Sequence, residues 1–366
     1  MEQRCQCGEP IEFEYQKGEV RKPGSVWNRY REFYGFDISE SYSLGEGDTS
    51  LTSLNKLSSE LGIELFAKNE TTNPTWSFKD RGTFLGVQQA AKNDFSKIGT
   101  VSTGNMAVSV AAYGARFDLD THIMVSKDID KVKLSQIGVY GPKIYRVDGD
   151  YGDLYFRSLE VGKSKEVYFI NSDDPYRVEG YKTIGFEIAE EMVPDHILIP
   201  TSSGGLFRGI VKSFMELKKS GIIQRLPEFT AVQGEGCSPI YYAYKEERDE
   251  ISHVKEKNTF AKAIANPYPP SGNEVLRKLK QLDGNCVSVC DGEIISSQKE
   301  LASEGIFAQP AGCVGIAAAK KLKDNERIEE GEKVVSIITG SGLKVRSGEF
   351  KGSQITDLNI DELETI

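Results

Sequence analysis

Short apolar runs alternate with longer amphipathic stretches along most of this chain, and the alternation predicts its elements. The apolar runs have the length and composition of strands, and they lie at 65–67, 121–125, 143–147, 196–200, 229–233 and 334–339. Amphipathic stretches that predict helices follow several of them, at 82–93, 107–117, 180–192 and 206–219. Strands that alternate with helices indicate an α/β protein, a parallel sheet with helices on both faces. Such sheets bind ligands at the carboxyl ends of their strands.

The same pattern predicts how the chain divides. Residues 1–45 read as an irregular N-terminal arm that packs on the body, because prolines and aromatic residues interrupt any period. No linker rich in Pro, Gly or Ser follows, so a second lobe must be an insertion whose chain returns to the first domain. We place a small α/β domain at 95–174, a large domain at 46–94 and 175–350, and a C-terminal tail at 351–366.

Composition narrows the function classes. The 366 residues are 39% hydrophobic and 27% charged, with a formal net charge of −10, which is typical of a globular protein. A net acid does not bind nucleic acid through its bulk charge, so an anionic ligand would need a local cluster of cations. No apolar run approaches the roughly 18 residues of a membrane span, and no apolar signal segment follows the first residues. We therefore expect no membrane partner and a cytoplasmic location.

The cysteines predict neither disulfides nor a metal site. Cys5 and Cys7 could form half of a zinc knuckle, but no second pair follows nearby, and the nearest histidine is His122. A structural zinc site needs four ligands, usually as two pairs. We expect no metal, and reduced thiols as in other cytosolic proteins.

Lys79 is the first candidate for chemistry. It lies in the segment NPTWSFKDRG (73–82), where Pro74 marks a loop and a helical pattern begins near Asp80. The positive potential at a helix N-terminus favours the neutral form of a lysine amine, and the neutral amine is the form that makes a Schiff base. The alternative reading is an ordinary surface lysine.

Three polar turns complete the set of candidate motifs. The turn STGNM (102–106) precedes a helix of small residues, and the glycine-rich turn PTSSGGL (200–206) joins an apolar run to a helix. Free backbone amides at such turns bind anions, although each turn alone could equally be a helix cap or a tight structural turn. The run IITGSGLK (337–344) ends a strand in hydroxyls and glycines. The glycine-rich turn is neither a P-loop nor a dinucleotide fingerprint, because the required spacings are absent.

Together and in this order, the four motifs resemble the tryptophan-synthase-β-like pyridoxal 5′-phosphate (PLP) enzymes, or fold type II. Within that superfamily the chain is similar to threonine synthases from about residue 27 to about residue 344. The most specific matches are SFKDRG and DPYR (174–177), supported by LGEGDTSL (44–51), QGEGCSPI (233–240) and EGIFAQP (304–310). The resemblance implies a large parallel-sheet domain, a smaller inserted α/β lobe and a homodimer.

The resemblance also implies roles for individual residues. Lys79 would hold PLP as a Schiff base and move protons, Asn105 would bind the phenolic oxygen, and Thr339 would face the pyridine nitrogen. Backbone donors to the cofactor phosphate would come from Ser203, Gly204, Gly205 and Leu206. The substrate's α-carboxylate would be held by Ser102, Thr103, Asn105 and Met106. Its phosphate would be held by Lys133, Asn171, Ser172 and Arg177, which supply the charge-assisted donors that a dianion requires.

Several positions depart from the pattern of threonine synthases. Met106 lacks the hydroxyl common there, Trp76 stands where a glycine is usual, and Ser341 stands where a histidine is common. The segment 264–272 matches only loosely. These departures lie around the expected substrate rather than around the cofactor.

The activity implied is conversion of O-phospho-L-homoserine and water to L-threonine and phosphate, by γ-elimination and β-addition. One alternative is a related enzyme acting on another phospho-amino acid, such as a cysteate-synthase-like β-replacement on O-phosphoserine. A threonine or serine dehydratase is a further alternative, and would leave Lys133 and Arg177 without a phosphate to bind. A binding protein without catalysis should have lost Lys79 or the glycine turn, and this chain retains both.

Overall fold

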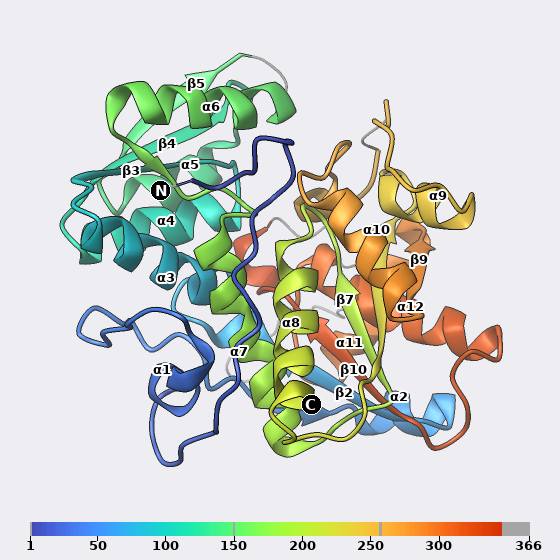
Figure 1. Cartoon of the computed structure of the whole chain (residues 1–366). Helices are drawn as coiled ribbons and strands as arrows, with labels where there is room; N and C mark the ends of the chain where they lie inside the picture. The colour runs from blue at the N-terminus through green and yellow to red at the C-terminus, as the bar shows by residue number, and fades with distance from the viewer. Residues whose placement is uncertain (1, 149–150, 256–257, 346–366) are drawn as a thin grey trace, which may run out of the picture.

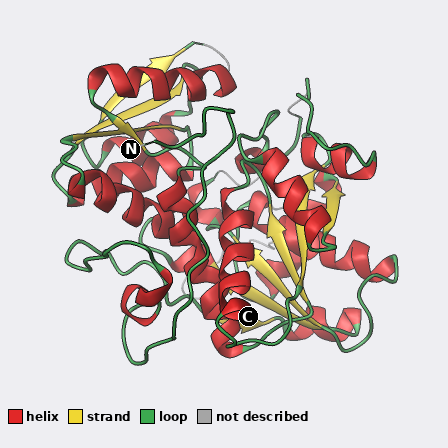
Figure 2. Cartoon of the chain, viewed as in Figure 1, coloured by secondary structure: helices red, strands yellow, loops and turns green. Residues whose placement is uncertain are grey.

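The protein contains two parallel-stranded sheets, each flanked by helices (Figures 1 and 2). The structure is a computed structural model, and it describes residues 2–148, 151–255 and 258–345. The predicted tail at 351–366 lies outside the described residues. Within these ranges no helix is both long enough and apolar enough to cross a lipid bilayer.

The larger sheet has six strands in the order β1-β2-β10-β7-β8-β9. All neighbours are parallel except β1 and β2, which run antiparallel. Val335 of β10 pairs with Phe66 on one side and with Ile197 on the other, so the last strand lies in the middle of the sheet. The strands are β1 (Leu51–Ser53), β2 (Glu64–Asn69), β7 (His196–Pro200), β8 (Glu228–Gly234), β9 (Asn285–Val289) and β10 (Lys333–Ile338).

Helices cover both faces of this sheet, as the sequence predicted. Successive side chains of a strand point to opposite faces. Accordingly, Ile197 and Ile199 join one buried cluster, whereas Leu198 between them joins the other. The first cluster draws on α3 (Lys79–Lys92), α7 (Pro175–Glu191), α8 (Gly205–Lys219), α9 (Pro239–Lys245) and α10 (Gly272–Gln281). The second draws on α2 (Asn55–Leu61), α11 (Asp291–Ser303) and α12 (Pro310–Asp324).

The smaller sheet is built wholly from residues 97–169, inside the range in which we expect the inserted lobe. Its strands are all parallel, in the order β5-β4-β3-β6. They are β3 (Lys97–Val101), β4 (Asp120–Ser126), β5 (Lys143–Val147) and β6 (Tyr168–Phe169), and they carry α4 (Asn105–Arg116), α5 (Lys131–Gly138) and α6 (Tyr151–Lys165). The chain enters this unit from α3 and leaves it through α7, and these two helices pack on each other.

The N-terminal arm is less irregular than expected. It contains α1 (Val26–Arg29) and a 3-10 turn, η1 (Arg31–Phe33). Trp27 and Phe33 of these turns are buried, with ring centroids 4.9 Å from Phe84 and 4.7 Å from Phe186. These aromatic contacts make the arm part of the larger core. The segment before them runs along α8, as the dark blue trace in Figure 1 shows.

The structure adds elements that the apolar pattern missed and starts several others earlier than predicted. Strands β1, β3, β6 and β9 and several helices had no sequence prediction. Helix α7 begins at Pro175 rather than at residue 180, because Asp174 caps it by accepting a hydrogen bond from the Arg177 amide at 3.2 Å, and proline suits a first helical position. The remaining 3-10 turns are η2 (Glu70–Thr72), η3 (Lys262–Ile264) and η4 (Gly342–Lys344).

Candidate active site

A cavity of about 330 Å³ opens where β3, β7 and β10 end, and it gathers most of the predicted residues from both units. This is the edge at which parallel sheets bind ligands. The predicted residues that line it are Lys79, Ser102, Thr103, Asn105, Met106, Lys133, Ser172, Ser203, Gly204, Gly205, Leu206 and Thr339. Asn171 and Arg177 do not line it.

Buried hydrogen bonds fix the loop that presents Lys79. The carboxylate of Asp80, which is fully buried, accepts hydrogen bonds from the amide and the hydroxyl of Thr75, both at 2.6 Å, and from the Ser109 hydroxyl at 2.6 Å. On the other side, Lys344 Nζ donates to the Thr75 carbonyl at 2.6 Å. Lys79 is the first residue of α3, so its direction into the cavity is set by this clamp.

The surroundings of Lys79 favour its neutral amine. Burial and, as the smaller cause, the nearby positive charge of Arg177 together lower the pKa of Lys79 to about 7. Lys79 Nζ lies 4.3 Å from the centre of the Phe78 ring, and no carboxylate in the described ranges forms an ion pair with it. At neutral pH a large fraction of the side chain is therefore available as a nucleophile.

The glycine-rich turn has the geometry of an anion cradle. Gly204 has a φ of 97°, which favours glycine, and a Cβ on Gly205 would lie 2.7 Å from the Ser172 carbonyl oxygen. No hydrogen bond within the described chain occupies the amides of residues 203–206, which open helix α8. Free amides at a helix N-terminus bind phosphate, so the turn fits the phosphate of a cofactor.

Asn105 and Thr339 face the same cavity from opposite units. Asn105 opens α4, and its Nδ2 donates to Gln309 Oε1 at 3.0 Å, which leaves its second amide hydrogen free for a ligand. Thr339 is held by its carbonyl, which accepts a hydrogen bond from the Phe78 amide at 3.1 Å. A Cβ on Gly312 would lie 3.2 Å from the Thr339 amide nitrogen, so this glycine lets α12 approach the turn.

The ionisable side chains that line the cavity are all lysines in the described part of the chain. Lys79, Lys133, Lys262 and Lys344 contribute amines, and no carboxylate lines the cavity within the described ranges. Burial lowers the pKa of Lys344 to about 8, against the raising effect of Asp80. Neither Lys133 nor Lys262 forms an ion pair or side-chain hydrogen bond with another described residue. An anionic ligand would complement this lining.

Two predicted phosphate-binding residues, Asn171 and Arg177, do not line the cavity, and their side chains bond to other residues. The Asn171 side chain forms its hydrogen bonds within the smaller unit, where its Oδ1 accepts one from the Val101 amide at 3.1 Å. Arg177 is fully buried and donates to the Thr83 hydroxyl at 2.7 Å and to the Tyr181 hydroxyl at 2.6 Å. No described carboxylate forms an ion pair with this guanidinium. Arg177 is thus a buried cation whose partners are neutral hydroxyls.

Ser172 provides an unused donor at the cavity wall. Its side chain is 5% exposed, and its hydroxyl has no hydrogen-bond partner among the described residues. A buried hydroxyl without a partner costs free energy, and a ligand oxygen would remove that cost.

Sequence reasoning missed several residues of the cavity. Gln309 and Lys344 lie inside motifs that were recognised, but no role was assigned to either. Asn266, whose Nδ2 donates to the Ser203 hydroxyl at 3.2 Å, and Lys262 lie in or beside the segment that matches loosely. Only the folded arrangement brings that segment to the glycine-rich turn.

The three positions at which the sequence departs from the threonine synthase pattern, Trp76, Met106 and Ser341, have different surroundings in the structure. Trp76 has a φ of 62° and is 50% exposed, so a tryptophan occupies a conformation that suits glycine. Met106 is buried in the larger core cluster. The Ser341 hydroxyl accepts a hydrogen bond from the Leu343 amide at 3.2 Å and caps η4.

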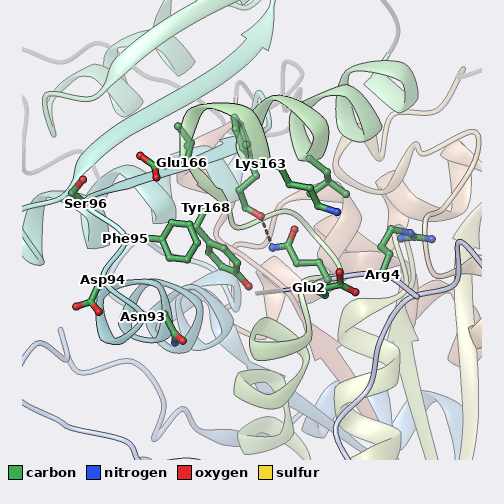
Figure 3. A pocket seen from close by; sticks show the side chains of 14 residues that line it. Glu2, Arg4, Asn93, Asp94, Phe95, Ser96, Lys163, Glu166 and Tyr168 are labelled. Atoms are coloured by element: carbon green, nitrogen blue, oxygen red, sulfur yellow. Dashed lines mark hydrogen bonds between the residues drawn. The ribbon is translucent and has the colours of Figure 1, made fainter. Parts of the chain in front are cut away.

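A second cavity, of about 520 Å³, lies apart from these residues, between the start of the chain and the smaller sheet (Figure 3). None of the predicted site residues lines it. Figure 3 shows Glu2 and Arg4 on one side of it and Phe95 and Ser96 on the other.

Comparison with solved structures identifies the fold. The processed form of threonine deaminase isoform 2 from Solanum lycopersicum matches with a TM-score of 0.71 at 22% identity, over 87% of this chain and 81% of that chain. Maize serine racemase matches with a TM-score of 0.71 at 22% identity, over 80% of this chain and 88% of that chain. At this level of identity the matches show a shared fold type, that of the fold type II PLP enzymes.

Comparison of sequences identifies the family. A model of the pyridoxal-phosphate dependent enzymes matches residues 42–340. A threonine synthase from Methanocaldococcus jannaschii is 37% identical, over 96% of this chain and 90% of the relative. A threonine synthase from Methanosarcina acetivorans is 35% identical, over 91% and 83%, respectively. The chain therefore belongs to the pyridoxal-phosphate dependent enzyme family, together with these threonine synthases, and its cofactor is pyridoxal 5′-phosphate.

Proposed function

We propose that this enzyme converts O-phospho-L-homoserine and water to L-threonine and inorganic phosphate. The observation that carries the proposal is the charge of the cavity, which Lys133, Lys262 and Lys344 line in addition to Lys79, with no described carboxylate among them. A dehydratase substrate carries no phosphate, and its site has no use for so many cations. The relatives that are named threonine synthases support the same product.

The chain's own residues would hold the cofactor in a defined place. Lys79 would bind its aldehyde carbon, the amides of 203–206 would bind its phosphate, and Asn105 would bind its phenolic oxygen. Thr339 would face the ring nitrogen. When bound, PLP supplies an electron sink for carbanions beside the substrate's amino group. A neutral hydroxyl at the ring nitrogen moderates that sink, which suits elimination better than transamination.

The substrate would be held at both of its anionic ends. Backbone and hydroxyl donors of the turn 102–106 would bind the α-carboxylate. Lys133 and the unpartnered hydroxyl of Ser172 would bind the phosphate, with the buried charge of Arg177 behind them. These groups would act most strongly as the C–O bond at Cγ breaks, because charge then gathers on the departing phosphate.

Lys79 would also transfer the protons. Its pKa of about 7 allows Nζ to accept a proton at neutral pH and to return it later. Nζ would take the proton from Cα, and a second proton would leave Cβ before the phosphate departs from Cγ. A proton would then be added at Cγ, water would add its oxygen at Cβ, and reprotonation at Cα would give threonine.

The test is a phosphate-release assay on the PLP-loaded enzyme, with threonine measured in the same reaction. Wild-type enzyme should release one phosphate per threonine from O-phospho-L-homoserine, and Lys79→Ala should release none. The matched control is Lys92→Ala, at the far end of the same helix and away from the cavity. It should keep wild-type activity.

Two other substrates distinguish the alternatives. Phosphate release only from O-phospho-L-serine with sulfite would replace the proposal by a β-replacement reaction. Ammonia release from L-threonine or L-serine, without use of either phosphate ester, would replace it by a dehydratase.

A further inference from the structure

Gln3, near the start of the chain, is bonded to the segment that joins the two units. Its side-chain amide donates to the Phe169 carbonyl at 2.7 Å and to Asp174 Oδ2 at 2.6 Å. Phe169 ends β6 of the smaller sheet, and Asp174 caps α7 of the larger unit. One side chain of the N-terminal arm thus spans the junction.

Arg4 makes a second set of contacts at the same junction. Its Nη1 donates to Asp173 Oδ2 at 2.6 Å, and its Nη2 donates to the Pro270 carbonyl at 3.0 Å. Asp173 is 2% exposed, and the Tyr155 hydroxyl of α6 also donates to it. Because Pro270 belongs to the larger unit and Tyr155 to the smaller, Arg4 and Asp173 form a largely buried ion pair between them, with side chains 15% and 2% exposed.

Residues 2–4, which we call the N-terminal strap, are held by these hydrogen bonds, and the Arg4 guanidinium also lies over the rings of Tyr155 and Phe156, 6.0 Å and 5.5 Å from their centres. The 520 Å³ cavity of Figure 3 lies beside the strap, with Phe95 and Ser96 on its far side. The side chains of Gln3 and Arg4 thus tie the strap to the junction, in addition to the backbone bond from the Ile11 amide to the Gln3 carbonyl at 3.3 Å.

The strap holds Asp173 and Asp174, which lie in the chain between two residues proposed to act on the substrate's phosphate, Ser172 and Arg177. Ser172, directly before Asp173, lines the active-site cavity, and its carbonyl is the oxygen that a Cβ on Gly205 would meet at 2.7 Å. Asp174 accepts a hydrogen bond from the Arg177 amide at 3.2 Å. A shift of segment 172–174 would move the Ser172 hydroxyl and the first turn of α7 together.

We propose that Gln3 and Arg4 are positioning residues for the substrate's phosphate, acting through Asp174 and Asp173 on Ser172 and Arg177. The identity of that phosphate rests on the proposed function, but the mechanical role does not. Without Arg4, Asp173 would be a buried carboxylate lacking its cation. Breaking one side of a buried pair is costly, and the segment would rearrange to bring that charge to water.

The kinetic test compares Arg4→Met with Arg4→Lys and with Arg21→Met, all loaded with PLP. Arg21 is a matched control, an arginine of the same arm that pairs with Glu32 but is far more exposed. Arg4→Met should raise KM for O-phospho-L-homoserine about tenfold or more, since small misplacements of binding groups have effects of this size or larger. The cofactor's visible absorbance should stay unchanged. Arg4→Lys should recover part of the loss, and Arg21→Met should match wild type.

A double variant separates positioning from general damage. In Arg4→Met with Asp173→Asn, the uncompensated charge is gone, so KM should be lower than in Arg4→Met alone. An unchanged KM in Arg4→Met, an equal loss in Arg21→Met, or a double variant no better than the single one would overturn the inference.

Hydrogen–deuterium exchange tests the strap without any substrate. Exchange at residues 172–178 should be faster in Arg4→Met than in wild type and Arg21→Met. Equal exchange rates overturn the strap's role whatever the kinetics. If wild-type enzyme does not use O-phospho-L-homoserine, the proposed function fails, and the exchange result alone decides the role of the strap.

Discussion

At the scale of single residues, the acidity of Lys79 is set by its neighbours. Burial beside Phe78 and the charge of Arg177 bring its pKa to about 7, whereas an exposed lysine titrates near 10.4. The motif around Lys79 could be recognised in the sequence, and so could the helix that begins there. Arg177 could not be identified as its electrostatic neighbour, because 98 positions of chain separate them and only folding brings α7 against α3.

This pKa predicts how the apo-enzyme captures its cofactor. A group with a lowered pKa is neutral above that value, so the rate of PLP capture should rise with pH and level off above about 7. Replacing the cation in Arg177→Gln should move the midpoint upward, by up to about one unit. Stopped-flow absorbance after mixing apo-enzyme with PLP measures both midpoints. A wild-type midpoint near that of a free lysine would contradict the prediction.

The backbone conformation of Trp76 predicts an effect on stability rather than on cofactor binding. Its φ of 62° costs a residue with a Cβ about 1–2 kcal/mol, and half of its side chain is exposed. Trp76→Gly should therefore raise the free energy of unfolding by about 1 kcal/mol. Trp76→Ala keeps the strain and should give no such gain. Urea unfolding of the two variants measures the difference, and a Gly variant less stable than the Ala variant would show that the strain argument fails.

At the scale of elements, the helix starts carry the site. Helices α3, α4 and α8 all begin at the cavity, with Lys79, Asn105 and Gly205 as their first residues. Sequence patterns identified these helices because strong turn signals precede them. The sequence pattern did not predict the short strands β1 and β6, since runs of two or three residues show no measurable hydrophobic period. The sequence also failed to predict that the segment around η3 lines the cavity, because neither its hydrophobic period nor its motif is distinctive.

The start of α8 provides a sharp test at this scale. In Gly205→Ala the new methyl would meet the Ser172 carbonyl at 2.7 Å, so the turn must open and the cradle of amides must distort. The Kd for PLP should rise at least about tenfold, in keeping with the loss of one charge-assisted hydrogen bond of about 1.5–3 kcal/mol. Fluorescence titration of apo-enzyme measures it.

The control for that variant is Gly292→Ala, in the first turn of α11. A Cβ there would meet nothing closer than the Cys290 sulfur at 3.8 Å. This variant should bind PLP as wild type does, and it should gain up to about 1 kcal/mol of stability, because alanine favours helix more than glycine does. Equal weakening of PLP binding in both variants would refute the cradle geometry.

At the scale of the whole molecule, two sheets, two buried clusters and one arm form the architecture. The alternation of apolar runs was enough to predict parallel sheets covered on both faces, because that pattern depends only on local period. The arm was predicted to pack on the body, but its packing partners were not. Its aromatic residues Trp27 and Phe33 pack on α3 and α7, and such long-range contacts leave no periodic signal in an irregular segment.

The arm's place in the core predicts a large loss of stability on truncating one side chain. Trp27 is 2% exposed, and its Nε1 donates to Glu46 Oε1 at 2.7 Å. Trp27→Ala should lower the free energy of unfolding by about 3–5 kcal/mol, the usual cost of removing a large buried aromatic side chain. Chemical denaturation checks the value. Tyr42→Ala, which removes an arm residue that is 46% exposed, should cost far less, and similar losses would mean that the arm is peripheral.

The contiguity of the smaller unit has an evolutionary consequence. Its sheet is formed by one uninterrupted stretch, 97–169, and that stretch and the residues just after it supply the turn 102–106, Lys133 and Ser172. The residues proposed to hold the cofactor come mainly from the other unit. Mutation or recombination within a single stretch could therefore change which amino acid is accepted while the inherited coenzyme chemistry stays intact. Duplicated copies of such a gene could diverge in substrate without first losing catalysis.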